Sequence, residues 1–72
     1  MYRGTYDKIE ANASYLKKIH AEGRLENFEL FDEPFKTAIQ ILDCGNMDHQ
    51  QASQYLGIST ETVKQVRRAL GI

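Results

Sequence analysis

Apolar residues recur every three or four positions along most of the chain, a spacing typical of amphipathic helices. Over about 5–22 one face is mainly apolar, with Tyr6, Ile9, Ala13, Leu16, Ile19 and His20. The opposite face is polar, with Asp7, Glu10, Ser14 and Lys18. This pattern predicts one long helix that Thr5 caps and Gly23 ends.

The next ten residues, 24–33, do not continue this pattern. Leu25, Phe28 and Phe31 are large apolar anchors in this segment, but the sequence lacks the alternation of a strand. We expect a packed loop or a single helical turn.

A second helix is predicted to start at Asp32 to Pro34, because proline fits the first turn, and to end at Cys44 before Gly45. Its buried face holds Phe35, Ala38, Ile39 and Leu42, with Ile41 to one side of that stripe.

Two shorter helices follow. Asp48 can cap a helix over 49–56, with Gln51 as its capping-box partner and Gly57 at its end. Ser59 or Thr60 can cap a last helix over about 60–70, which Gly71 closes. The predicted fold is all-α, one small four-helix domain spanning 1–72, with a three-helix core over 33–72.

The sequence "YLGIST" joins the last two helices by a very short connection. Gly57 can take the positive φ that ends a helix within one residue, while Leu56 and Ile58 pack on either side of it. Ala52 and Ser53 are small, so the two helices can cross closely. Val63, Val66 and Leu70 form the buried stripe of the last helix.

With these features, the segment over about 49–68, "HQQASQYLGISTETVKQVRR", resembles the helix-turn-helix family of DNA-binding domains. Ser53 stands where that family typically has alanine. The resemblance implies that helix 60–70 enters the major groove of double-stranded DNA. A structural or protein-binding use of the same corner is the alternative.

Opposite the buried stripe, helix 60–70 is polar. Its exposed face carries Glu61, Lys64, Gln65 and Arg68, with Thr60 and Arg67 on one flank and Thr62 on the other. Gln65 suits adenine, Lys64 or Arg68 suits guanine, and Glu61 suits cytosine. Ser59, Thr60, Gln50 and Gln51 are expected to meet phosphates. The alternatives are a helix-start charge for Glu61 and a solvated face for Lys64, Arg67 and Arg68.

The net charge of −1 limits what such a face can do. Three basic side chains give a salt slope of only about −2.7, so one copy is expected to bind weakly. We therefore predict a homodimer reading two half-sites. The first helix is our candidate dimerisation element, because Tyr2, Tyr6 and Tyr15 add apolar area to it. Ile41, Phe28 and Phe31 are further candidates, and core packing is the alternative for each.

Enzymatic and metal chemistry is not expected. The single cysteine and two histidines form neither a disulfide framework nor a zinc motif. Cys44 is expected near the exposed side of its helix beside Asp43, which disfavours a reactive thiolate. We predict no cofactor, no membrane segment and no signal peptide, and a cytoplasmic location.

Two functions remain open. The favoured one is a small sequence-specific regulator of transcription, in the simplest case a repressor. The alternative is a protein-binding adaptor or inhibitor that docks a transcription or replication protein through residues 22–33. This segment holds Glu22, Glu26, Glu29, Asp32 and Glu33 among its aromatic residues, against Arg24 alone.

Overall fold

The computed structural model describes residues 3–24 and 28–72. These form α1 (Arg3–Ala11), α2 (Ala13–Glu22), the 3-10 turn η1 (Phe28–Leu30), α3 (Glu33–Asp43), α4 (His49–Leu56) and α5 (Thr60–Leu70). No strand occurs within the described residues, so the predicted all-α class is confirmed.

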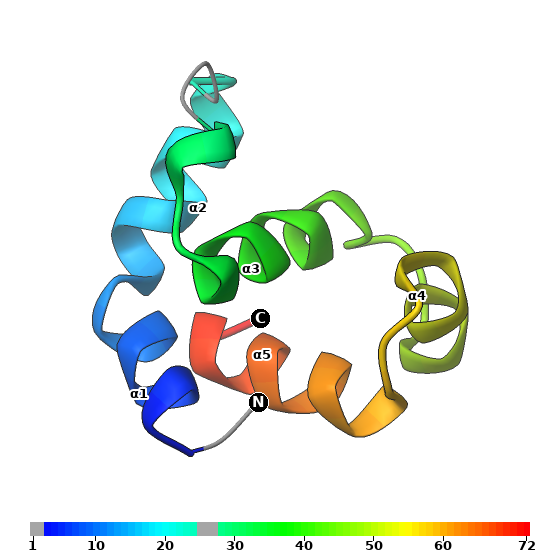
Figure 1. Cartoon of the computed structure of the whole chain (residues 1–72). Coiled ribbons are helices and arrows are strands. Elements are labelled where there is room, and N and C mark those ends of the chain that lie inside the picture. Colours follow the sequence, from blue (N-terminus) through cyan, green and yellow to red (C-terminus); the bar gives the residue numbers. More distant parts are fainter. Residues whose placement is uncertain (1–2, 25–27) are drawn as a thin grey trace.

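The helices surround a small core in which α5 is central (Figure 1). α3 and α5 run across the middle of the molecule and contact each other. α4 lies at one end of this pair, while α1 and α2 lie at the other. α5 contacts α1, α2, α3 and α4, so its position depends on the whole chain.

The prediction of one long N-terminal helix is wrong. The chain breaks at Asn12, whose φ of −112° and ψ of 14° lie outside the α-helical region. The Asn12 side chain donates to the Lys8 carbonyl oxygen at 2.9 Å, a local bond that competes with helix continuation. The break lets α1 and α2 contact different helices: α1 lies mainly along α5, and α2 lies mainly along α3.

Thr5 is not a cap, because α1 already begins at Arg3 and Thr5 is buried within it. The other predicted helix ends agree closely with the structure. Gly23, Gly57 and Gly71 end α2, α4 and α5 in the left-handed conformation. Asp32 precedes α3, Asp48 and Gln51 form the capping box of α4, and Ser59 caps α5. Short-range signals therefore place most of the boundaries.

The core is one main cluster with a smaller one beside it. The main cluster contains the buried residues Ile9, Leu16, Ile19, Ala38, Ile39, Ile41, Val66, Ala69 and Leu70. The smaller one contains Cys44, Ala52 and Val63. Each fully buried aliphatic side chain contributes about 1.5–3 kcal/mol, so these clusters provide most of the stabilisation.

Two burial predictions need correction. Cys44 is buried and belongs to the smaller cluster, although it was expected on the exposed side of its helix. Ile41 is fully buried in the main cluster, so it is not available as a dimer contact. Ile41 is enclosed by residues of α1, α2 and α5, whereas Cys44 is enclosed by Ala52 of α4 and Val63 of α5. Helices that are distant in sequence therefore bury more than one stripe of α3.

Polar contacts between the helices lie mainly at the surface. Lys8 of α1 pairs with Asp32 at 2.9 Å and lies over the ring of Phe35. His20 of α2, expected to be a packed or interface residue, contacts Asp43 at the end of α3. Both carboxylates are more than half exposed, so each pair contributes at most about 1 kcal/mol.

The expected connector over 24–33 contains the single helical turn η1. Phe31 is half-buried and packs against the main cluster. Leu30 is 81% exposed. Leu25, Glu26 and Tyr2, and the side chain of Phe28, lie outside what the structure describes.

The left-handed conformation of Gly57 is testable. A Cβ at this position would meet nothing within 4 Å, so Gly57→Ala tests the backbone alone. At a φ of +71° we expect it to lower the free energy of unfolding by about 1–2 kcal/mol in urea titrations. Gly57→Asn is the matched control and should cost less than half as much, because asparagine tolerates this region. Equal losses for both variants would contradict a φ effect.

Candidate nucleic-acid interface

The corner between α4 and α5 is held by backbone bonds and by packing. The N–H groups of Gly57 and Ile58 both donate to the Ser53 carbonyl oxygen, at 2.9 and 3.1 Å. Leu56 and Ile58 are half-buried and pack against both core clusters. These hydrogen bonds and core contacts hold the turn in place, so the direction in which α5 begins is fixed.

Ser53 strengthens this corner in a way that its sequence position did not reveal. It is buried, and its hydroxyl donates to the Gln50 carbonyl oxygen at 2.8 Å. The same hydroxyl accepts from Thr60 Oγ1 at 3.3 Å, which links α4 to the first residue of α5. Beside it, Ala52 is fully buried, as the predicted close helix crossing requires. A serine in place of alanine thus adds a polar link across the turn.

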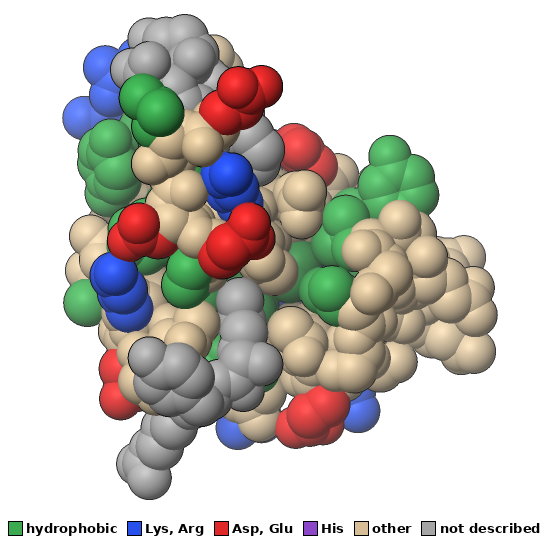
Figure 2. Space-filling view, in the orientation of Figure 1, with side chains coloured by type: hydrophobic (Ala, Val, Ile, Leu, Met, Phe, Trp, Pro, Cys, Tyr) green, Lys and Arg blue, Asp and Glu red, His purple; other side chains and the backbone are tan. Residues whose placement is uncertain are grey.

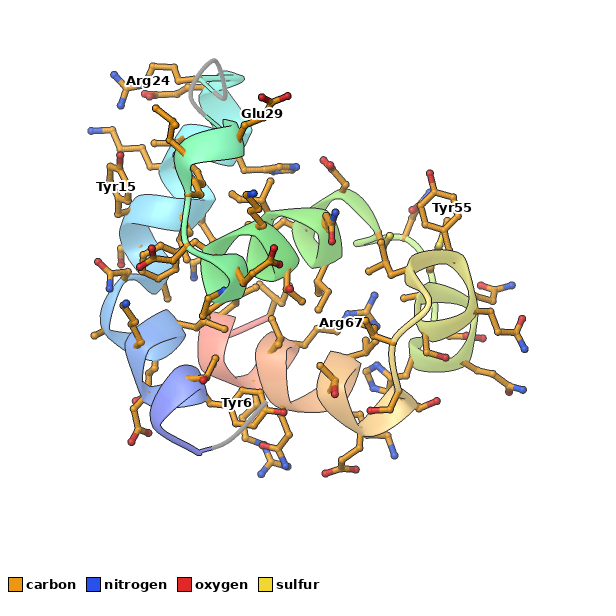
Figure 3. The ribbon with its side chains drawn as sticks, in the orientation of Figure 1. Tyr6, Tyr15, Arg24, Glu29, Tyr55 and Arg67 are labelled. Carbon is orange, nitrogen blue, oxygen red and sulfur yellow. The ribbon has the colours of Figure 1, made fainter. Side chains whose placement is uncertain are left out.

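The Arg67 side chain anchors α5 to the connection between α3 and α4, whereas the sequence pattern placed it on a flank of the exposed polar face. Its Nη2 donates to the carbonyl oxygens of Cys44 and Met47, at 2.9 and 2.7 Å. Its Nη1 lies 2.8 Å from His49 Nδ1, which must accept because a guanidinium has only donors. Figure 3 shows the side chain directed inward between α5 and the start of α4.

The expectation that Arg67 contacts DNA is therefore not supported by its geometry. The carbonyl of Cys44, at the C-terminal end of α3, already accepts from the Met47 backbone N–H at 2.9 Å, and the guanidinium is a second donor to it. The guanidinium N–H groups of Arg67 that could bind a phosphate instead donate to acceptors within the protein.

Three hydroxyls expected at the interface are also engaged locally. Ser59 Oγ accepts from the Thr62 backbone N–H at 3.1 Å and shares a 2.8 Å bond with Thr62 Oγ1. Thr60 Oγ1 is turned toward Ser53. Gln51 is occupied as well, since its side-chain oxygen accepts from the Asp48 backbone N–H. These residues shape the turn and the helix starts, whatever else they contact.

The polar face of α5 remains open in its N-terminal part. Glu61, Lys64 and Arg68 are exposed, and Gln65 is half-buried. Gln65 Nε2 donates to Glu61 Oε1 at 2.9 Å, so these two side chains present a joined amide and carboxylate. Among the described residues, neither Lys64 nor Arg68 has an ion-pair partner. Gln50, at the start of α4, is exposed too.

The C-terminal part of this face is bordered by acidic side chains from α1. Arg68, Gln65 and Ala69 line a shallow hollow of about 290 Å³ together with Tyr6, Asp7 and Glu10. Carboxylates at this edge repel an approaching phosphate and weaken any contact that Arg68 makes. The free cations of α5 thus differ in their surroundings, with Lys64 outside this acidic hollow.

No protein-family model, curated protein or solved structure matches this chain. The resemblance to helix-turn-helix domains therefore stays a prediction, argued from the residues and their contacts.

The described part of the chain lacks both a metal-binding cluster and a membrane-spanning helix. It contains no group of three or more His, Cys, Asp or Glu side chains that could hold a metal ion. None of its helices has both the length and the apolar character that crossing a membrane requires.

The inward position of Arg67 leads to a stability test. Arg67→Ala removes hydrogen bonds to two backbone carbonyls and should lower the free energy of unfolding by about 2 kcal/mol or more. The neighbouring Arg68→Ala is the matched control, because Arg68 is exposed and should change stability by no more than about 0.5 kcal/mol. Thermal unfolding of both variants measures this. Similar losses at the two positions would refute the role assigned to Arg67.

Proposed function

We propose that this protein is a small sequence-specific regulator that binds double-stranded DNA and acts most simply as a repressor by occupying a promoter. In this proposal α4 and α5 act as a helix-turn-helix, and α5 enters the major groove. One observation supports this proposal most strongly. The rigid turn at Gly57 positions α5 so that Val63, Val66 and Leu70 are buried while its polar side stays exposed.

The first turns of α5 are the part that we expect to enter the groove. N-terminal residues of a recognition helix reach the base edges first. Here Glu61 and Lys64 do not line the hollow that contains Asp7 and Glu10, whereas Gln65 lies at its edge. Lys64 would donate to guanine, while the joined Glu61 and Gln65 side chains would meet an adenine or cytosine edge. Arg68 would lie nearer the phosphates.

The charge available for this binding is small. With Arg67 occupied, each copy offers Lys64 and Arg68, which gives a salt slope of about −1.8. The affinity then falls only about 12-fold between 50 and 200 mM salt, whereas a dimer with four contacts would lose about 150-fold. Tight binding at physiological salt therefore favours two copies on one site.

Substitution of Lys64 tests the proposal. Lys64→Ala should weaken DNA binding and lower the salt slope by about 0.9 for one copy, or about 1.8 for a dimer. Lys18→Ala is the matched control, since it removes the same charge from an exposed position on α2. Fluorescence anisotropy over a salt series measures both variants, with the duplex taken from a selection of bound sequences from a random pool.

A wild-type protein that retains no duplex at low salt would overturn the proposal. Equal effects of Lys64→Ala and Lys18→Ala would also contradict it, because they would show a diffuse charge effect without a role for α5.

A second function, a protein-binding adaptor, is favoured by a different observation. Tyr15, Leu16, Leu30, Phe31, Asp32 and Phe35 line a hollow of about 280 Å³ beside η1. Leu30 is 81% exposed there, and Glu29 next to it is exposed as well. In this alternative the hollow receives an apolar side chain from a basic segment of a transcription or replication protein. Absence of DNA retention in a folded protein would favour this function.

A further inference from the structure

The end of the molecule formed by α4 carries almost no charge. From Cys44 to Thr60 the chain contains one acidic residue, Asp48, and no lysine or arginine. The Asp48 carboxylate accepts from the Gln51 backbone N–H at the start of α4. In Figure 2 the surface over α4, on the right, shows neither acidic nor basic side chains, whereas both kinds occur over the rest of this face.

This uncharged surface also contains a hollow. Met47, Gln51, Gln54 and Tyr55 line a space of about 470 Å³. Tyr55 is 72% exposed at its rim, and Figure 3 shows its side chain directed away from α5. An exposed aromatic ring and a methionine, surrounded by amides and free of charges, match the composition of the central part of protein interfaces.

The lack of charge favours a particular kind of partner, a second copy of the same chain. Near a two-fold axis, each residue lies close to the same residue of the other copy. A charged side chain there would therefore face an identical charge and be repelled. The α4 surface avoids this repulsion. By contrast, the hollow beside η1 adjoins the exposed Glu29 and Glu33, so two copies meeting there would bring these carboxylates together.

We infer that two copies of this chain associate through the α4 surface defined by Met47, Gln51, Gln54 and Tyr55. Tyr55 lies at the rim of an open hollow, so across a two-fold axis each Tyr55 ring can pack against Met47 and the hollow of the other copy. The side-chain amides of Gln51 and Gln54 can form hydrogen bonds between the two copies around this contact. The apolar stripe of the N-terminal helices is not free for a dimer contact, because Ile9, Leu16 and Ile19 are buried within the single chain.

The size of the molecule limits the strength of this dimer. A standard interface buries about 800 Å² on each partner. Since the whole chain exposes 4739 Å², such a contact would need about one sixth of the surface. We expect a reversible dimer with a dissociation constant on the order of micromolar.

The inference does not depend on the proposed DNA binding, because it is tested without DNA. The dimer is compatible with that function, since Figure 3 shows Tyr55 directed away from α5. Gln51 would then lie in the dimer contact, whereas the sequence pattern placed it against a phosphate.

Sedimentation equilibrium of the full chain, at concentrations on both sides of the micromolar range, is the experiment. Wild-type protein should dimerise, and Tyr55→Glu should weaken the dimer by at least about 30-fold, because it places two carboxylates face to face. Tyr15→Glu is the matched control on α2, at a side chain that is 57% exposed, and should leave the dimer unchanged. Circular dichroism verifies that both variants are folded.

A mixing experiment separates a specific contact from a general loss of apolar surface. Tyr55→Lys alone should also be monomeric, but an equal mixture of Tyr55→Lys and Tyr55→Glu should form a heterodimer. Wild-type protein that stays monomeric throughout would overturn the inference. So would a dimer that survives Tyr55→Glu, one that Tyr15→Glu abolishes, or a mixture that stays monomeric.

Discussion

Burial of one side of α5 is the constraint on which the rest of this structure depends. Val63, Val66 and Leu70 are fully enclosed, and the helix contacts α1, α2, α3 and α4. At about 1.5–3 kcal/mol for each side chain, this burial outweighs the exposed ion pairs of Lys8 and His20, which contribute at most about 1 kcal/mol each. The other helices are therefore arranged around the apolar side of α5, and its polar side is left outside.

Arg67 adds direction to that packing. Apolar contacts alone let a helix rotate or slide slightly, whereas the guanidinium bonds to the Cys44 and Met47 carbonyls fix the rotation of α5 relative to the α3–α4 connection. At the turn between α4 and α5, the hydroxyl of Ser53 bonds to the Gln50 carbonyl and to Thr60, which links the two helices. A site that recognises a rigid partner benefits from this arrangement, because its side chains are held before binding and little further ordering is needed.

The surface divides into regions with different chemistry. The open part of α5 offers Lys64 beside the joined Glu61 and Gln65, while the carboxylates of α1 border its C-terminal part. The α4 surface of Met47, Gln51, Gln54 and Tyr55 contains no charged side chain, and the hollow beside η1 combines aromatic and acidic side chains. These differences explain how a nearly neutral chain can support the proposed DNA binding. In that proposal few cations limit non-specific binding, so the affinity would come from base contacts and from a second copy.

Local signals in the sequence were sufficient for the helical class and most helix ends. Gly57, Asp48 with Gln51, and Ser59 act on backbone groups within a few residues, so their effect is encoded locally. Periodicity likewise identified Val63, Val66 and Leu70 as the buried side of the last helix, because that burial follows from the helix repeat.

Only the tertiary structure decided where the long-range contacts lie. The break at Asn12 escaped prediction because the apolar period continues through it, and the local hydrogen bond that interrupts the helix leaves no such trace. Cys44 and Ile41 were misplaced because their burial depends on α2, α4 and α5 closing around them. Arg67 looked like a surface cation, since its carbonyl partners lie 20 and 23 residues away. Which polar residues stay free for a partner is thus a property of the packed chain, because neighbours distant in sequence take up the others.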